Sequence, residues 1–388
     1  MEKKEIISSI STWGNGEIYL GVVGAVRTGK STFIKKVIEN FIVPNIEDED
    51  LKKRCIDESP QSAPGKTIMT MEPKFIPSSG ANIKIDEFTT NVKLIDCVGY
   101  VVKSANGYED ELGNPRMVKT PWYDEEIPFM EAAEIGTEKV IKDHATIGIV
   151  MTTDGSFGEF TRGEITSTEE KVITELKMIN KPFIVILNTT HPEKEETRNL
   201  AKSLTDNYDV PVLPVNVDKM NEKDMYEILK TALYEFPILD IEINIPSWVH
   251  MLNNDHPIKE EYITKLRESV DGISKLKDAD KIISYYQDSK YINKAYISNV
   301  NTKTGVVTLN LDSSNELYNE TLKELLGGIT LNKGNLLKIF MDYSSGKDEI
   351  SSVKDALKMA KATGYGIVYP SLSDMKLSTP EIIKQGSK

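Results

Sequence analysis

The segment GVVGAVRTGKST, residues 21–32, constrains the fold more than any other part of this 388-residue chain. An apolar run ends at Gly24, four residues follow, and then come Gly29, Lys30 and Ser31. A buried strand that leads through a glycine-rich turn into a helix presents its backbone N–H groups to a phosphate. The spacing therefore predicts a phosphate-binding loop, or P-loop, between a strand and a helix.

Each residue of this loop has an expected task. The backbone amides would curl around the β-phosphate, Lys30 would bridge β- and γ-phosphate oxygens, and the Ser31 hydroxyl would bind Mg²⁺. Arg27 is a candidate for a built-in cation that offsets the γ-phosphate charge; the alternative is a solvated surface arginine. The residues expected to contact the nucleotide are Gly24, Ala25, Val26, Arg27, Thr28, Gly29, Lys30, Ser31 and Thr32.

A second acidic group is expected to hold the magnesium ion through water. The apolar stretch of residues 92–95 ends in Asp96, and Gly99 follows three residues later. An Asp-x-x-Gly at this distance from a P-loop is typical of switch II in GTPase-like proteins, where the glycine amide reaches the γ-phosphate. We therefore expect both Asp96 and Gly99 to lie at the nucleotide.

Residues 64–70, between these two motifs, occupy the position of switch I. A threonine usually closes there over the γ-phosphate and Mg²⁺, and Thr70 is the first candidate, with Thr67 the second. The alternative is a polar loop with two ordinary threonines. The predicted catalytic residues are Lys30, Asp96, Thr70 and Arg27, and the predicted metal ligands are Ser31, Thr70 and Asp96.

The nucleotide base should be read after the apolar strand of residues 183–187. A GTPase would carry Asn-Lys-x-Asp there, and this chain carries Asn188, two threonines and His191. Without the aspartate that pairs with guanine, the main reason to exclude adenine disappears, because specific sites reject a wrong ligand by leaving buried polar groups unpaired. We therefore expect ATP, with Asn188 still bordering the nucleotide.

The residue that orients the attacking water is not evident. GTPases often place Gln or His directly after the switch II glycine, and here Tyr100 and Val101 follow. This hydrophobic pair predicts slow turnover, or a water oriented by another group. A long polar insertion, residues 100–128, starts at the same point, and Trp122 and Tyr123 favour a packed segment that can dock a partner.

The first 240 residues are expected to form one α/β domain, because short apolar strands alternate with helical segments and so predict a mostly parallel sheet covered on both faces. Residues 241–388 are expected to form a smaller α+β domain. Its predicted elements are one long amphipathic helix over residues 257–288, a β-hairpin over residues 295–311 and two helices around residues 317–326 and 353–362. The 257–288 segment could also pack as a hairpin or a short coiled coil.

Composition excludes several classes of protein. A formal net charge of −13 without a long Lys/Arg block argues against nucleic-acid binding. No window approaches 18 uncharged apolar residues, so any membrane association would be peripheral. Cys55 and Cys97 are too few for a disulfide framework, which favours a reducing, cytoplasmic compartment. The four histidines show no metal-ligand spacing.

Five stretches of the sequence resemble the family of stage IV sporulation protein A, the morphogenetic ATPases of endospore-forming Firmicutes. They are GVVGAVRTGKSTFIKK, SAPGKTIMTMEPKF, LIDCVGY, PFMEAAEIGT and ALYEFP, and the resemblance continues to the end of the chain. It implies a P-loop domain related to translation-factor-type GTPases that uses ATP. Lys30, Asp96 and Thr70 match the family's P-loop lysine, magnesium aspartate and sensor threonine, whereas Met71 stands where Bacillus-type members carry a second threonine.

The resemblance also implies a biological role. Hydrolysis in this family drives self-assembly into a layer on the outer forespore membrane, in the mother-cell cytoplasm, on which the spore coat is built. The implied partners are the protein itself, spore coat and coat-morphogenetic proteins, and a small amphipathic membrane-anchoring peptide. That peptide acts through a C-terminal domain, and we expect this chain to lack that domain beyond Lys388.

Two other functions stay open. A regulatory GTP-binding switch would show guanine selectivity and reversible partner binding. A structural scaffold with a non-hydrolysing nucleotide site would hold nucleotide without turnover and would assemble whether or not Lys30 is present.

Overall fold

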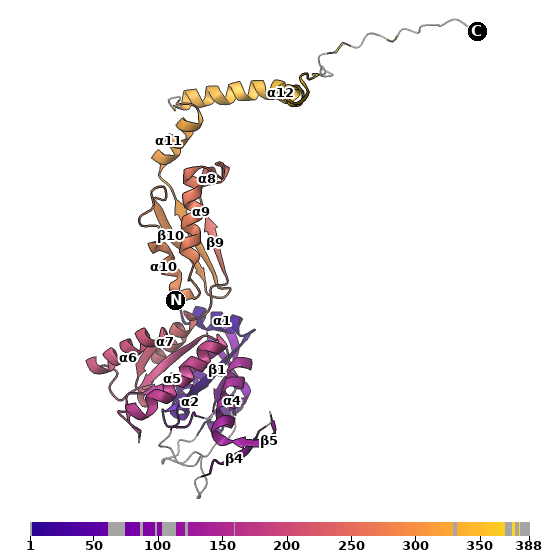
Figure 1. The fold of residues 1–388 in the computed structure, drawn as a ribbon. Coiled ribbons are helices and arrows are strands. Elements are labelled where there is room, and N and C mark those ends of the chain that lie inside the picture. Colours follow the sequence, from indigo (N-terminus) through magenta and orange to yellow (C-terminus); the bar gives the residue numbers. More distant parts are fainter. Residues whose placement is uncertain are drawn as a thin grey trace, which may run out of the picture. The chain divides into compact units, whose positions relative to one another are not determined.

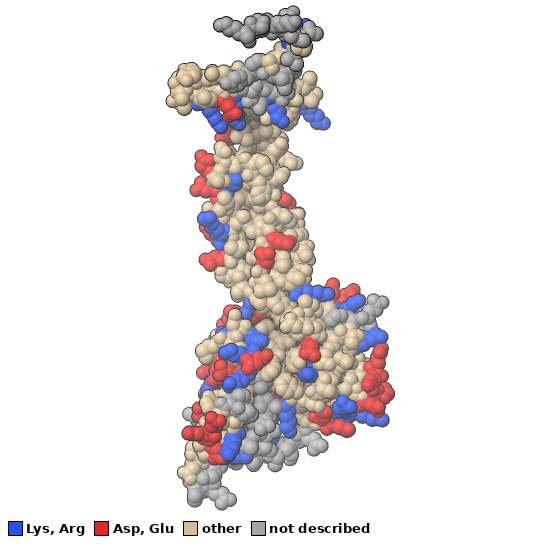
Figure 2. Space-filling model, turned by 90° about the vertical axis from the view of Figure 1, so that its right-hand side faces the viewer, with Lys and Arg blue, Asp and Glu red and all other residues tan. Residues whose placement is uncertain are grey.

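The computed structural model describes residues 2–60, 74–85, 88–97, 99–102, 114–120, 123–158, 160–328, 332–368, 375–376 and 380. The chain divides into two compact units, Met1–Asp312 and Ser313–Lys388, so the expected boundary at residue 240 lies inside the first unit. Within the described residues, no helix combines the length and apolar composition needed to cross a bilayer. On the face shown in Figure 2, Lys and Arg side chains are mixed with Asp and Glu.

A six-stranded sheet forms the centre of the first unit (Figure 1), in the order β2-β3-β1-β6-β7-β8. All neighbouring strands run parallel except β2, which pairs antiparallel with β3 at one edge. The expected α/β architecture with a largely parallel central sheet is therefore confirmed. The strands are β1 (Glu17–Gly24), β2 (Lys74–Ile85), β3 (Phe88–Asp96), β6 (Ile147–Thr153), β7 (Phe183–Asn188) and β8 (Val212–Val215).

Helices cover both faces of this sheet, which explains why β6 and β7 are buried along their whole length. One face carries α1 (Lys3–Trp13), α2 (Lys30–Val37), which continues as a π-helical turn (Ile38–Ile42), and α7 (Glu222–Leu233). The other face carries α4 (Phe129–Asp143), α5 (Arg162–Ile179) and α6 (Glu195–Tyr208). Two short 3-10 turns (Val43–Asn45 and Val217–Lys219) and α3 (Glu49–Asp57) complete the layers.

The central strand β1 packs tightly between the two helical layers. A Cβ atom on Gly21 would lie 2.2 Å from Cδ1 of Ile141 and 3.0 Å from Cβ of Ala145, so a larger residue would require these side chains to move. Parallel pairing brings the carboxyl ends of β1, β3, β6 and β7 to the same edge of the sheet. In open α/β sheets ligands bind at this edge.

The polar insertion contains a small hairpin within its described part. Strands β4 (Met117–Thr120) and β5 (Tyr123–Pro128) pair antiparallel, and the side chain of Tyr123 is exposed. Trp122 lies outside the described residues, so its expected packing stays a prediction.

Residues 240–312 form a three-stranded sheet that helices cover. Strand β11 (Val306–Asp312) pairs antiparallel with β10 (Lys294–Asn301), as the expected hairpin requires, and parallel with β9 (Asp240–Asn244). The accompanying helices are α8 (Ser247–Met251), α9 (Pro257–Val270), a 3-10 turn (Leu276–Asp278) and α10 (Ala279–Ser284).

The structure differs here from the single helix expected over residues 257–288. Helix α9 ends at Val270, and Gly272 has a φ of +76°, a left-handed conformation that cannot continue a helix. The buried residues of α9 are Ile258, Tyr262 and Ser269, whereas Ile263 of the expected apolar face is exposed. The three- and four-residue spacing therefore runs across a break between two elements.

This part packs on the first helix of the chain. The Trp13 ring lies 5.1 Å from the Phe236 ring, and its indole N–H donates to the Thr302 carbonyl at 2.7 Å. The second unit contains α11 (Asn315–Leu325) and the 31-residue helix α12 (Lys333–Thr363). The two helices expected around residues 317–326 and 353–362 correspond to α11 and to the C-terminal part of α12.

Candidate functional site

The glycine-rich loop, residues 24–31, connects β1 to α2 through backbone conformations that glycine permits. Gly24 has a φ of +138° and Gly29 a φ of +97°, and Arg27 between them also has a positive φ, of 64°. A Cβ atom on Gly24 would lie 2.2 Å from the Met151 carbonyl oxygen on β6. The loop therefore needs its glycines both for its turns and for its close approach to β6.

Lys30 begins α2, and its side chain lies buried beneath the loop. The ammonium group donates to the carbonyls of Gly24 at 3.2 Å and Ala25 at 2.7 Å. Burial lowers the pKa of Lys30 to about 8; Asp96 counteracts this shift, and Arg27 adds to it. The chain thus holds a cation in a low-dielectric position where an anion would stabilise it.

Asp96 ends β3 and lies in register with Val22 on β1, two residues before the loop. Burial raises the pKa of the Asp96 carboxyl, and the neighbouring Lys30 counteracts the shift. Gly99 lies against the Lys30 side chain, because a Cβ atom there would be 2.5 Å from the ammonium nitrogen. The fold therefore brings the glycine-rich loop, Asp96 and Gly99 together around one ammonium group.

Tyr100 extends the β1–β3 pairing beyond the strands. Its backbone N–H donates to the Gly24 carbonyl at 3.0 Å, and its carbonyl accepts from the Val26 N–H at 2.9 Å. The buried hydroxyl donates to Glu175 of α5 at 2.5 Å, and burial and this carboxylate raise the pKa of Tyr100. The side chain thus packs into the core, and its backbone anchors the start of the switch II segment.

The other predicted loop residues are held by short-range contacts. The Thr28 hydroxyl is fully buried and donates to the Ala25 carbonyl at 2.8 Å, which braces the turn. Val26 packs in a small apolar cluster with Val102 and Phe160. The half-buried residues of the loop and of the first turn of α2 are Arg27, Gly29, Ser31 and Thr32. Thr67, Thr70 and Met71 lie outside the described residues, so the switch I assignment stays a prediction.

Asn188 connects three segments at the edge of the site. Its side-chain N–H donates to the Thr28 carbonyl at 3.2 Å, and its side-chain carbonyl accepts from the Val217 N–H at 3.3 Å. Both ends of the amide are therefore bonded to the protein backbone. At the position of the guanine-reading aspartate, the His191 side chain is 51% exposed.

Asp154, directly after β6, is a residue at this edge that the sequence motifs did not single out. Its carboxylate accepts from the Thr189 hydroxyl at 2.5 Å and from the Ser156 N–H at 2.9 Å. Burial alone would raise its pKa, but these hydrogen bonds outweigh burial and leave the pKa of Asp154 lowered. The only signal in the sequence was an acidic residue directly after the strand Ile147–Thr153, whose apolar part ends at Met151.

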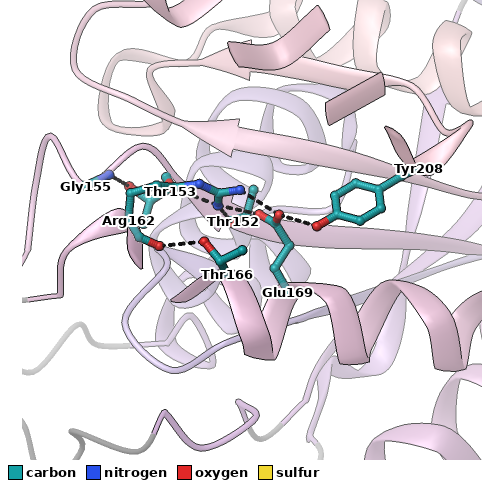
Figure 3. A network of polar contacts seen from close by, with 7 residues as sticks. All are labelled: Thr152, Thr153, Gly155, Arg162, Thr166, Glu169 and Tyr208. Carbon is teal, nitrogen blue, oxygen red and sulfur yellow. Dashed lines mark hydrogen bonds and ion pairs between the residues drawn. The ribbon is translucent and has the colours of Figure 1, made fainter. Parts of the chain in front are cut away.

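A buried ion pair anchors the loop between β6 and α5 (Figure 3). This loop borders the glycine-rich loop, because a Cβ atom on Gly29 would lie 3.9 Å from the Phe157 ring. Arg162 makes two hydrogen bonds to the carboxylate of Glu169, at 2.5 and 2.7 Å, and Glu169 is almost fully buried. The Tyr208 hydroxyl donates to the same carboxylate at 2.9 Å. The Thr152 hydroxyl also donates to it. Arg162 also donates to the Thr153 carbonyl, so the network fixes the first turn of α5 to the end of β6.

The donor set suits a magnesium ion that a nucleotide brings with it. Mg²⁺ prefers hard oxygen ligands and usually keeps several waters and substrate phosphates in place of an all-protein cage. The chain offers a hydroxyl, on Ser31, and a carboxylate, on Asp96. Among the described residues no cluster of three or more His, Cys, Asp or Glu could hold a metal ion without such a substrate.

Gly29 can be compared with Gly16, because their φ angles are nearly equal, at +97° and +95°. A Cβ atom on Gly16 would meet nothing within 4 Å, whereas one on Gly29 would lie 2.3 Å from the Asn188 amide nitrogen. We expect Gly16→Ala to lower the free energy of unfolding by about 1–2 kcal/mol, the cost of a left-handed alanine. Gly29→Ala should lower it further and disrupt the Asn188–Thr28 contact. Equal losses in urea unfolding would contradict this geometry.

Arg162→Ala should be strongly destabilising, because it leaves the Glu169 carboxylate buried without its cation. The expected loss is about 3–5 kcal/mol in the free energy of unfolding. The control is Lys171→Ala on the same helix, whose ion pair with Glu134 is exposed and contributes at most about 1 kcal/mol. Urea unfolding measures both, and a loss at Arg162 no larger than that at Lys171 would argue against the anchoring role.

Comparisons with known proteins agree over the whole chain. The family model described as "Stage IV sporulation protein A, ATPase domain" matches residues 1–237, and the one described as its middle domain matches residues 238–388. Proteins named stage IV sporulation protein A from Bacillus anthracis and Bacillus subtilis are 48% and 47% identical over 100% of this chain and 79% of their own length. The one from Clostridioides difficile is 46% identical over 99% of this chain and 78% of its own. The chain belongs to the stage IV sporulation protein A family.

Proposed function

We propose that this chain hydrolyses ATP in the presence of Mg²⁺, and that hydrolysis drives its self-assembly into a scaffold layer at the forespore surface, on which the spore coat is built. The family's ATPase domain, matched over residues 1–237, supports the first part. The observation that carries the proposal is the buried Lys30 ammonium group beneath the glycine-rich loop. A buried cation with a lowered pKa is costly to the fold until an anion approaches it.

The neighbours of Lys30 favour a triphosphate as that anion. The loop presents backbone N–H groups at the start of α2, where the helix dipole favours negative charge. Gly99 lies beside the ammonium group, where its amide can reach a terminal phosphate oxygen. Bound Mg²⁺ would neutralise phosphate charge, and the Ser31 hydroxyl and the Asp96 carboxylate would orient it. The residues themselves would bind and position the phosphates and so stabilise the charge that develops in phosphoryl transfer.

The order of the strands is in line with a P-loop NTPase of the translation-factor type. The strand that carries the loop is central, the strand that ends in Asp96 is its neighbour, and the antiparallel β2 lies at the edge. The segment that would contain switch I lies in the sequence between α3 and β2, and β2 pairs with the strand that ends in Asp96. We also propose that Thr70 closes over the γ-phosphate.

Adenine is the proposed base because the position of the guanine-reading aspartate carries no carboxylate. His191 stands there and is half-exposed, and the Asn188 amide is bonded to Thr28 and Val217. Two described carboxylates lie near this corner: Asp154 accepts hydrogen bonds from Thr189 and Ser156, and the exposed Glu193 lies 3.7 Å from the His191 ring nitrogen Nδ1.

The cellular part of the proposal rests on family membership. We place the protein in the mother-cell cytoplasm, peripheral to the outer forespore membrane, where it would contact other copies of itself, coat proteins and coat-morphogenetic proteins. A small amphipathic peptide is the further proposed partner, and it would anchor the full-length protein through the family's C-terminal domain.

One observation favours a scaffold that binds nucleotide without turnover. Tyr100 follows Gly99, where GTPases often carry Gln or His, and its side chain packs into the core against Glu175. Its backbone contacts the glycine-rich loop, but its hydroxyl is bonded to Glu175 and is therefore not placed to orient a water there. A measurement of phosphate release distinguishes slow hydrolysis from no hydrolysis.

Phosphate release with ATP and with GTP, each with Mg²⁺, tests the proposal directly. We expect turnover with ATP and a loss of at least about 100-fold in both Lys30→Met and Asp96→Asn, because each removes a charged group at the phosphates. The control is Lys35→Ala on α2, whose exposed ammonium group lies 3.8 Å from Glu39 and away from the loop. Preferential GTP turnover would favour the regulatory switch. Two results together would favour the non-hydrolysing scaffold: the chain binds nucleotide but releases no phosphate, and Lys30→Met leaves its assembly unchanged.

Lys30→Met should also stabilise the nucleotide-free chain. The change removes a buried charge, and both carbonyls keep a second donor, the Tyr100 N–H on Gly24 and the Thr28 hydroxyl on Ala25. We expect a gain of about 1–2 kcal/mol in the free energy of unfolding, together with loss of the stabilisation that Mg-ATP confers. Lys36→Met, six residues further along the chain and paired with Glu39, should change neither. Destabilisation by Lys30→Met without nucleotide would make Lys30 a structural residue.

A further inference from the structure

Helix α12 has almost no buried contact of its own. Of the residues described in the second unit, only Thr321 and Ala356 are buried. A helix of 31 residues, about 46 Å long, obtains most of its stability in a protein from packing along one face. Large apolar side chains are instead exposed along α12, namely Leu337, Phe340, Met341, Tyr343, Val353, Leu357 and Met359. The helix, drawn in yellow in Figure 1, therefore needs a partner surface.

The apolar residues of α12 follow a heptad repeat over four heptads. In the sequence, the a positions are Leu336, Tyr343, Ile350 and Leu357, and the d positions are Ile339, Gly346, Val353 and Ala360. Every one of these eight positions, which we call the α12 seam, is apolar or small. Such a repeat is typical of helices that pair with another helix as a coiled coil. Along the seam, Tyr343 is 63%, Leu357 54% and Val353 44% exposed.

Charges beside the seam select the partner and its direction. Asp342 occupies a g position and Lys347 the e position five residues later. In the sequence, Glu349 and Lys354 repeat this relation one heptad on, and Lys361 occupies the next e position. In a parallel pair, a g residue meets the e residue of the next heptad on the other helix, so acidic and basic groups meet. In an antiparallel pair, e meets e and g meets g, which would bring like charges together.

We propose that the α12 seam is a dimerisation surface, on which two copies of this chain pair through α12 as a parallel, in-register coiled coil. Pairing would cover the exposed seam residues and place Asp342 of each copy against Lys347 of the other. The inference rests on the self-assembly in the proposed function and deepens it by naming one contact between copies. It does not require nucleotide, so dimerisation and ATP turnover are measured separately.

Two double variants of the full chain test the seam. Tyr343→Asp/Leu357→Asp places charges at two a positions, and Leu337→Asp/Met359→Asp places the same charges off the seam, at residues of matched exposure, 61% and 54%. Sedimentation equilibrium without nucleotide, up to about 100 µM, should find a dimer for the wild type and the off-seam variant. The seam variant should raise the dissociation constant at least about 10-fold. All four positions are exposed in the single chain, so both variants should fold alike by circular dichroism.

Charge reversal tests the direction of the pair. Asp342→Lys and Lys347→Asp should each weaken the dimer about 3- to 10-fold, and the double variant that exchanges the two charges should recover wild-type affinity. An equimolar mixture of the two single variants should form heterodimers. Ala360→Cys, at a d position near one end of the helix, should form a disulfide between two copies on oxidation. Met359→Cys, off the seam, should not, and Cys55 and Cys97 are buried.

A wild-type chain that stays monomeric at about 100 µM would overturn the proposal, as would equal weakening by the seam and off-seam variants. In that case another surface, such as a lipid bilayer or a different protein, covers α12. If the dimer depends on the seam but is antiparallel, Asp342→Lys would not weaken it and Ala360→Cys would not form the disulfide. That result would overturn the parallel arrangement. None of these results bears on ATP turnover, and failure of turnover would leave the dimer intact.

Discussion

Two parallel pairings of β1 determine where the candidate site residues lie. Pairing with β3 sets Asp96 beside Val22, and pairing with β6 sets Gly24 beside Met151. The Tyr100 backbone extends the first pairing by one bridge, which holds Gly99 against the Lys30 ammonium group. Between them the two neighbours pair with every residue of β1, so the point at which the loop leaves the sheet is fixed. A preorganised set of donors is the condition for electrostatic stabilisation of a transferring phosphoryl group.

The buried ammonium group is the stability cost of this arrangement. Lys30 begins a helix, where a cation is disfavoured by the helix dipole, and it lies away from water with two carbonyl acceptors. Strain and unfavourable charge at a site are tolerated where the surrounding structure compensates for them. Here the compensation comes from the apolar cores on both faces of the sheet and from the Arg162–Glu169 pair, which fixes the neighbouring loop.

The two units distribute their apolar residues in opposite ways. In the first, both faces of the central sheet are covered, so the domain satisfies its own hydrophobic surface. In the second, the described apolar side chains lie mostly on the outside of α11 and α12. Exposed apolar residues in a regular heptad favour association between chains over folding of a single chain. A nucleotide site in one unit and an association surface in the other suit a protein that assembles.

The sequence by itself determined the local features of this protein. The loop from Gly24 to Ser31, the Asp96–Gly99 motif and the hairpin over residues 295–311 depend on contacts between near neighbours, and these are visible as spacing. Tertiary structure decided the contacts between distant residues: the Asn188 amide between Thr28 and Val217, the Tyr100–Glu175 hydrogen bond, and the Arg162–Glu169–Tyr208 network. The break at Gly272 shows the reason. Periodicity reports which residues are apolar, but whether two helical turns belong to one helix depends on the backbone between them and on the surfaces that each one meets.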